Sequence, residues 1–196
     1  MVYATNYVAE RPGLRKLNHN EAPADLPAEV KEELLRRVGE ASWHRYPDPF
    51  HDELRAALSD YTGRPGEGIL ITNGGNDAIF RLLLAMDPGR PVVSCPPCYY
   101  LYDRISRVLG LERREAPLQA RGFGIDWDAV RAAADPPGVV LLTSPNNPTG
   151  QRVDRGELER FLAETDALVL ADEAYFEFAG ETVVDLIDAH DNLLVL

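Results

Sequence analysis

The chain has 196 residues, of which 45% are hydrophobic, 27% charged and 8% aromatic. This composition is typical of a globular protein and excludes a disordered, collagenous or disulfide-rich chain. The 20 Lys and Arg residues stand against 32 Asp and Glu residues, which gives a formal net charge of -12. A nucleic acid or an anionic membrane surface would repel such a protein, so we expect neither as a partner.

The sequence carries no signal of a membrane-bound, secreted or metal-binding protein. Its two cysteines are too few for a disulfide framework or a four-cysteine zinc site. The N-terminal segment is charged, and no apolar run approaches the roughly 20 residues that a membrane-spanning helix needs. The four histidines show no spacing typical of metal ligands. We therefore expect a cytoplasmic protein that binds no metal.

Two helices are predicted first, at residues 27–38 and 51–63, on either side of a turn-rich break. From residue 68 onward, short apolar runs alternate with amphipathic helical patterns. The predicted strands cover residues 68–72, 91–95, 111–116, 138–143, 167–171 and 192–196. The predicted helices between them cover residues 76–86, 99–109, 126–134 and 154–165. This alternation predicts an α/β fold with a mostly parallel sheet flanked by helices, in which ligands bind at the carboxyl ends of the strands.

The strongest motif follows the predicted strand 138–143 and reads SPNNPTG at residues 144–150. Two prolines stiffen this loop, and Asn147 presents an amide that can donate a hydrogen bond to a ligand oxygen. A rigid turn before a helix uses the same residue types. The motif alone therefore leaves a binding loop and a plain turn both open.

A carboxylate is predicted at the end of the next strand, where Asp172 begins the sequence DEAY. Burying a carboxylate is costly unless a cation or hydrogen-bond donors pair with it. Asp172 therefore needs a partner, and a protonated heterocycle is one. The alternative is an exposed acidic loop, or an acid at a helix N-terminus that the helix dipole favours.

A glycine-rich turn, TNGGNDA at residues 72–78, follows the first predicted strand and opens a helix. Glycines allow a ligand to approach the backbone closely, and the free N–H groups at the start of a helix can bind a phosphate. The same residues also suit an ordinary turn and helix cap.

The sequence CPPCYY at residues 95–100 joins another strand to its helix. The ring of Tyr99 can stack on a planar ligand. Cys95 and Cys98 form a C-x-x-C pair, which is redox-active in thioredoxin-like proteins. We interpret Tyr100 and Tyr102 as core or interface aromatics.

Together these loops offer a phosphate cradle, a ring-stacking aromatic, an amide donor and a carboxylate, which suits a flat, phosphorylated, nitrogen-containing cofactor. In their order and spacing they resemble the fold-type-I pyridoxal-phosphate aminotransferases, and most of all the histidinol-phosphate aminotransferases. The resemblance extends to LNHNE at residues 17–21 and to Tyr46-Pro47. It implies pyridoxal 5'-phosphate as the cofactor and an incomplete large domain of that fold, without the C-terminal small domain.

The resemblance implies a role for each matched residue around the cofactor ring. Asp172 would face the pyridine nitrogen and keep it protonated, which makes the ring a better electron sink. Asn147 and Tyr175 would hold the 3-oxygen of the ring, and Tyr99 would stack on its face.

Other matched residues would hold the phosphate group. Gly75, Asn76 and Asp77 would bind it, mainly through backbone N–H groups. The pair Asn76-Asp77 departs from the Asp-Glu that is frequent in the family. Tyr46 would reach the phosphate of a partner subunit's cofactor, which implies a homodimer with shared sites.

Asn20 and Glu21 would lie near the substrate, an amino-acid-like donor that exchanges its amino group with a 2-oxo acid. We divide the chain into an N-terminal arm and helix, residues 1–45, and a partial cofactor-binding large domain, residues 46–196.

The Schiff-base lysine of the family has no counterpart in the sequence, so no catalytic residue is assigned. Lys16 and Lys31 precede the whole cofactor region, and the family's lysine comes shortly after the strand that matches residues 192–196. We expect a fold cut short there and a chain that is inactive by itself. The alternatives are a pyridoxal-phosphate decarboxylase of the threonine-phosphate type and a truncated, non-catalytic binding module.

Overall fold

The computed structural model describes residues 13–14 and 19–196. Its strands are β1 (Val92–Ser94), β2 (Arg113–Glu115), β3 (Val139–Thr143), β4 (Leu168–Asp172) and β5 (Leu193–Val195). Its α-helices are α1 (Ala28–Glu40), α2 (Asp52–Thr62), α3 (Gly75–Leu84), α4 (Leu101–Val108), α5 (Trp127–Ala133), α6 (Arg155–Glu164) and α7 (Phe176–Ala179). Two short 3-10 helices complete the set, η1 (Gly66–Gly68) and η2 (Val184–Asp188). In this part of the chain, no helix is long and apolar enough to cross a membrane.

The five strands form one parallel sheet in the order β2-β1-β3-β4-β5. The register pairs Val139 with Leu168 and Thr143 with Asp172, so β3 and β4 end side by side. The predicted α/β class and parallel sheet are confirmed. Because all strands run the same way, the loops after them gather at one edge of the sheet.

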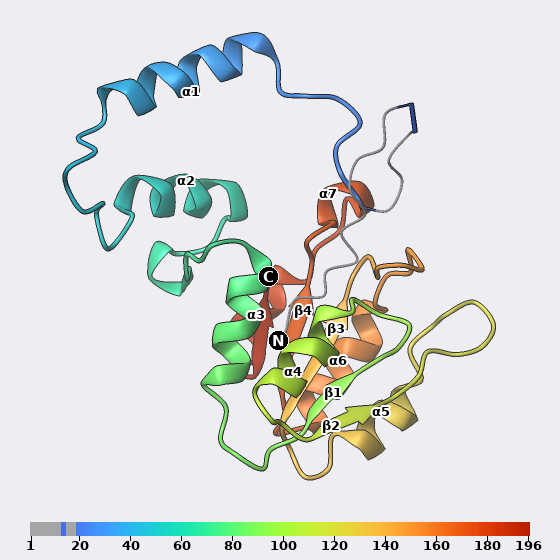
Figure 1. Ribbon diagram of the computed structural model, residues 1–196. Coiled ribbons are helices and arrows are strands. Elements are labelled where there is room, and N and C mark those ends of the chain that lie inside the picture. The colour runs from blue at the N-terminus through green and yellow to red at the C-terminus, as the bar shows by residue number, and fades with distance from the viewer. Residues whose placement is uncertain (1–12, 15–18) are drawn as a thin grey trace.

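Helices cover both faces of the sheet, which explains the continuous apolar runs of its strands. Alternate residues of β3 point to opposite sides: Val140 and Leu142 pack with α5 and α6, whereas Val139 and Leu141 pack with α3 and α4. Figure 1 shows α3 and α4 on one side of the sheet and α6 on the other. The core therefore has two layers, and the central strand β3 is buried throughout.

Two of the helices on the sheet begin at aspartates that cap them. The Asp126 carboxylate accepts a hydrogen bond from the N–H of Ala129 at the start of α5. The Asp154 carboxylate does the same for Glu157 at the start of α6. A side-chain acceptor at this position satisfies an N–H group that has no partner within the helix. The predicted helices at 126–134 and 154–165 are thereby confirmed, with their starts.

The strand predicted at residues 68–72 is wrong. Residues 66–68 form η1, and residues 69–72 extend without joining the sheet. Leu70 is 78% exposed, although its neighbours in the sequence are apolar. A strand needs a neighbouring backbone to pair its N–H and C=O groups, and no strand in the described part of the chain pairs with this segment.

The helices α1 and α2 are present as predicted, but they stand apart from the sheet (Figure 1). No residue of α1 or of α2 is buried. The apolar stripe of α1, which includes Leu34 and Val38, is about half exposed. Tertiary packing therefore contributes little to α1 within the described residues, and its own side chains must support it.

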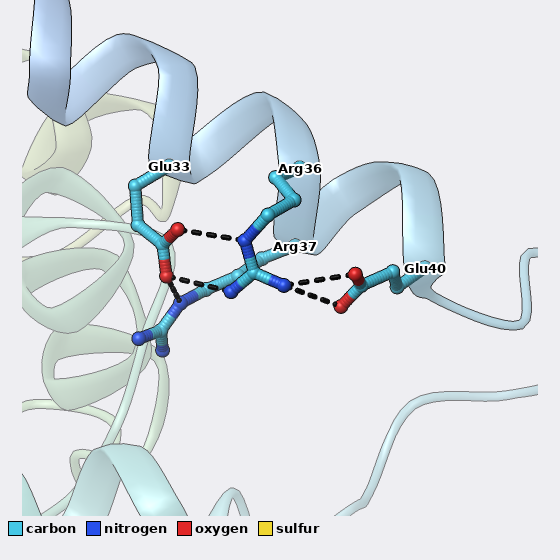
Figure 2. Close-up of polar contacts among 4 residues, drawn as sticks. All are labelled: Glu33, Arg36, Arg37 and Glu40. Atoms are coloured by element: carbon cyan, nitrogen blue, oxygen red, sulfur yellow. Dashed lines mark hydrogen bonds and ion pairs between the residues drawn. The ribbon is translucent and has the colours of Figure 1, made fainter.

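Ion pairs within α1 provide that support. Glu33 accepts hydrogen bonds from Arg36 and Arg37, three and four residues further along the helix. Arg36 also donates to both oxygens of Glu40. Figure 2 shows how these contacts link the four side chains along one side of the helix. The two guanidinium groups lower the pKa of Glu33 to about 2.

Candidate functional site

A hollow of about 240 Å³ lies at the carboxyl ends of the strands. Side chains and backbone from the ends of β3, β4 and β5 and from the start of α3 converge on it. Its lining residues are Asn73, Gly74, Gly75, Asn76, Ile79, Tyr99, Thr143, Asn147, Asp172, Ala174, Tyr175 and Leu196. Six of the residues that the sequence analysis singled out for the cofactor are thus brought together, namely Gly75, Asn76, Tyr99, Asn147, Asp172 and Tyr175.

Asp172, the last residue of β4, is the most deeply buried charged group at the hollow, with 4% of its surface exposed. Its Oδ2 accepts a hydrogen bond from the Tyr102 hydroxyl at 2.5 Å, and its Oδ1 accepts one from the Ala174 N–H at 3.2 Å. Burial raises the pKa of the carboxyl group, and the two hydrogen bonds oppose that rise. Among the described residues, no cation pairs with it. Within this part of the chain, the carboxylate therefore has hydrogen-bond donors but no counter-charge.

Glu173, the next residue, points to a different part of the molecule. Its carboxylate is also buried, and it accepts hydrogen bonds from the Thr182 hydroxyl and the Val183 N–H. Successive residues of an extended chain face opposite sides, so the two acids of the DEAY sequence are separated. Glu173 anchors the segment before η2, and Asp172 alone faces the hollow.

Tyr102 is the contact that the sequence analysis missed. It lies in the core, as interpreted, with 1% exposure. Its hydroxyl also bonds to Thr143 at 2.8 Å and to Asp172, which lies 70 residues further along the chain. The one available signal was its spacing of three residues from Tyr99, which places both rings on one side of a helical turn. Their rings meet edge-on, with centroids 5.7 Å apart.

The loop 144–150 is held by its own polar side chains. The Asn146 amide donates to the Pro97 carbonyl at 3.0 Å and to the Thr149 hydroxyl at 2.8 Å. The Ser144 hydroxyl accepts from the Val153 N–H at 3.1 Å. Asn146 is buried by these contacts, whereas Asn147 lines the hollow. The rigid-turn interpretation of the motif is therefore confirmed, and the turn places Asn147 at the hollow. Its role as a donor to a ligand stays a prediction.

The start of α3 offers backbone N–H groups to the hollow. Gly74 precedes the helix with φ +76°, a conformation that favours glycine. No side chain of the described residues caps this helix. A Cβ atom on Gly75 would lie 3.2 Å from a methyl group of Leu196, so a larger residue would crowd this edge. An anion fits such a helix start.

The two residues after Gly75 behave differently. The Asn76 Oδ1 accepts a hydrogen bond from the Tyr99 hydroxyl at 3.0 Å, which leaves the amide nitrogen as a donor. The Asp77 carboxylate instead turns back to the Asn73 N–H and to Arg81. Asp77 does not line the hollow, and its N–H donates to the Gly74 carbonyl at 3.2 Å. The expected phosphate contact of Asp77 stays a prediction.

The N-terminal residues reach the site only in part. The Asn20 amide donates to the Tyr175 hydroxyl at 3.0 Å, which places Asn20 at the rim of the hollow. Glu21 is exposed and does not line the hollow. Residues 17 and 18 of the LNHNE motif lie outside the described residues. Tyr46 is 99% exposed; its expected role concerns a second subunit and stays a prediction.

Neither cysteine has the character of a redox thiol. Cys95 is buried, and burial raises its pKa to about 12. Burial also raises the pKa of Cys98. The thiolate is the reactive form, so these shifts argue against a thioredoxin-like activity. The described residues also include no cluster of three or more His, Cys, Asp or Glu side chains that could hold a metal ion.

The lining fits pyridoxal phosphate in its chemistry. The buried Asp172 carboxylate has no cation beside it among the described residues and suits a protonated ring nitrogen. Asn147 and Tyr175 line the same hollow and carry groups that can form hydrogen bonds to ring substituents. The helix start suits a phosphate. An amine for a Schiff base is not among these residues: Lys31 lies on α1, paired with Asp25, and Lys16 lies outside the described residues.

Comparison with known proteins agrees with this chemistry. The family model described as "Aminotransferase class I and II" matches residues 13–196. A histidinol-phosphate aminotransferase of Chlorobaculum parvum is 40% identical over 185 residues, which cover 92% of this chain and 52% of that protein. One of Desulfitobacterium hafniense is 42% identical over 193 residues, with coverages of 94% and 53%.

A solved structure shows the same fold with the cofactor named. The histidinol-phosphate aminotransferase of Sinorhizobium meliloti in complex with pyridoxal 5'-phosphate superposes with a TM-score of 0.67 at 25% identity, over 77% of this chain and 42% of that one. The chain spans about half the length of the curated relatives that it matches. The resemblance inferred from the motifs is confirmed, and the chain belongs to the class I and II aminotransferase family.

Proposed function

We propose that this chain forms the cofactor-binding half of a pyridoxal-phosphate-dependent aminotransferase of the histidinol-phosphate type. One observation supports the assignment above the others. A carboxylate with 4% exposure and no cation among the described residues stands at the wall of a strand-end hollow. Keeping such a carboxylate ionised is costly, and a protonated pyridine ring supplies the missing charge.

The residues of the hollow have distinct tasks in this proposal. Asp172 pairs with the ring nitrogen and keeps it protonated. Asn147 and Tyr175 hold the 3-oxygen, and Tyr99 covers one face of the ring. The cofactor, when bound, supplies an electron sink for the carbon that loses its proton.

The phosphate group of the cofactor binds at the start of α3 in this proposal. The backbone N–H groups of Gly75 and Asn76 donate to it, and the Asn76 amide nitrogen adds a side-chain donor. Asn20, at the rim beside Tyr175, lies where a substrate enters, and we assign Asn20 and Glu21 to substrate contact.

The reaction is the exchange of an amino group between an amino-acid-type donor and a 2-oxo acid. Histidinol phosphate is our first choice of donor, because the relatives carry that name. We assign neither Lys16 nor Lys31 as the lysine that carries the cofactor and moves the proton in this family. We expect the complete protein to be a cytoplasmic homodimer.

The test compares amino transfer with decarboxylation in the full-length protein. Amino transfer from histidinol phosphate to a 2-oxo acid, without release of carbon dioxide, supports the proposal. Release of carbon dioxide as the main reaction favours a decarboxylase instead. Asp172→Asn should slow amino transfer by roughly three orders of magnitude or more, because the ring nitrogen loses its counter-charge. Turnover near that of the wild type in this variant contradicts the assignment.

A further inference from the structure

A buried tyrosine hydroxyl connects the ends of two strands to each other. The Tyr102 hydroxyl lies 2.5 Å from Asp172 Oδ2 and 2.8 Å from Thr143 Oγ1. A tyrosine hydroxyl has one proton, and an ionised carboxylate can only accept. The Tyr102 proton therefore goes to Asp172, and the Thr143 hydroxyl donates its own proton to the Tyr102 oxygen. The hydrogen bonds run in one direction, from Thr143 through Tyr102 to Asp172.

Rigid elements hold all three members of this chain of hydrogen bonds. Thr143 and Asp172 are the last residues of β3 and β4 and are paired in register. The ring of Tyr102 lies in the apolar cluster between the sheet and the helices α3 and α4, with 1% exposure. A side chain that is locked by packing can position its neighbour more accurately than one on a loop.

Tyr102 provides the one side-chain donor to Asp172 within the described residues. The other donor is the Ala174 N–H, on the opposite carboxylate oxygen. The titratable groups that line the same hollow are Tyr99 and Tyr175, and neither has a hydrogen bond to Asp172. Glu173 bonds to Thr182 and Val183 instead.

We propose that Tyr102 is a positioning residue for Asp172: its hydroxyl, oriented by Thr143, keeps the carboxyl group ionised and turned toward the hollow, ready for a cationic ring nitrogen. This inference rests on the proposed function, because the ring nitrogen is that of the proposed cofactor. Tyr102 itself does not line the hollow and acts through Asp172.

The first test measures the ionisation of Asp172 in the cofactor-free, full-length protein. The carbon-13 signal of its carboxyl group, identified by its loss in Asp172→Asn, is followed against pH. Tyr102→Phe removes a donor to the charged form, so the midpoint of protonation should rise by about one pH unit or more. Tyr100→Phe is the matched control, since Tyr100 is 60% exposed and lies two residues away. An unchanged or lowered midpoint in Tyr102→Phe overturns the inference.

The second test uses pyridoxamine phosphate, which binds without a Schiff base. Where Asp172 is already protonated, binding of the cationic ring must release a proton, so the affinity falls with decreasing pH. In Tyr102→Phe the affinity for pyridoxamine phosphate should begin to fall at a pH about one unit higher than in the wild type. In an Asp172→Asn background the same substitution should not shift the profile. A shift of equal size in that background shows that Tyr102 does not act through Asp172, and it overturns the inference.

The two proposals can fail separately. If Asp172→Asn leaves the affinity for pyridoxamine phosphate unchanged, the proposed function fails, whereas the Asp172 midpoint still measures the effect of Tyr102. If Tyr102→Phe does not fold, Thr143→Val takes its place. It removes the donor to Tyr102 and should raise the Asp172 midpoint in the same direction by a smaller amount. No change in Thr143→Val overturns the inference.

Discussion

Asp172 shows how function and stability oppose each other at one side chain. The structure buries its carboxylate without a cation among the described residues and satisfies it with two hydrogen bonds. Burial raises its pKa above the usual 3.8. The folded protein therefore binds a proton more readily than the unfolded chain, and this group lowers the stability as the pH rises from 3.8 through the folded-state pKa.

Asp172→Asn should remove this pH-dependent cost. An amide can donate to the Tyr102 oxygen while Tyr102 donates to Thr143, so the buried groups stay bonded. We expect the cofactor-free variant to melt at or above the wild-type temperature at neutral pH, with the difference shrinking toward pH 4. Thermal unfolding followed by circular dichroism at several pH values measures this. A variant that is less stable than the wild type at neutral pH would show that the carboxylate is stabilising.

Tyr99 combines a ring face with a hydroxyl that has its own contact. Tyr99→Phe keeps the ring and removes the donor to Asn76 Oδ1. The Asn76 amide then loses the bond that orients it, and we expect the affinity for pyridoxamine phosphate to fall by roughly three- to tenfold. Inorganic phosphate as a competitor should lose affinity in parallel. A loss as severe as that of Asp172→Asn would assign the hydroxyl a further role.

The helix α1 illustrates an element that its own side chains support. None of its residues is buried, and its ion pairs lie along one side (Figure 2). The lowered pKa of Glu33 means that these pairs are formed at neutral pH. Their contribution is complete above the usual carboxyl pKa of 4.5 and is lost as the pH falls toward about 2.

Glu33→Gln should loosen α1 at neutral pH. The substitution removes the charge shared by Arg36 and Arg37, and amide hydrogen exchange within α1 should become roughly two- to fivefold faster. Glu32→Gln, an exposed position on the same helix, serves as the control and should have a smaller effect. Equal exchange in the two variants would mean that the ion pairs do not support the helix.

Several large apolar side chains on and between α1 and α2 are exposed. Leu34, Trp43, Tyr46 and Phe50 are all about half exposed or more. Exposed apolar side chains mark an interaction site where they lie together on the surface. The exposure of Tyr46 is compatible with the homodimer that we propose, in which Tyr46 reaches a second subunit.

Leu34→Glu should therefore weaken self-association of the full-length protein. Sedimentation velocity over a range of concentrations should show a dimer for the wild type and a shift toward monomer for the variant. Val108→Glu is the control. Val108 is the last residue of α4 and is half exposed, and this variant should remain dimeric. A monomeric wild type, or a variant that dimerises as the wild type does, would contradict this arrangement.

The sequence alone was sufficient for the fold class, the five strands of the sheet and the family. Each of these depends on local patterns: apolar runs predict strands, Asp126 and Asp154 mark helix starts, and the motifs at 144–150 and 172–175 follow strand ends. Because all strands are parallel, the positions of these motifs also predicted that Asn147 and Asp172 would meet at one hollow.

Only the tertiary structure decided which groups contact each other around that hollow. The Tyr102 hydroxyl meets Asp172 across 70 residues, Glu173 turns away to Thr182, and Asp77 folds back onto its own helix. Residues 69–72 have the composition of a strand but pair with no strand in the described part of the chain. Hydrogen-bond partners and strand neighbours depend on how distant segments pack. Patterns within a short stretch of sequence therefore do not predict them.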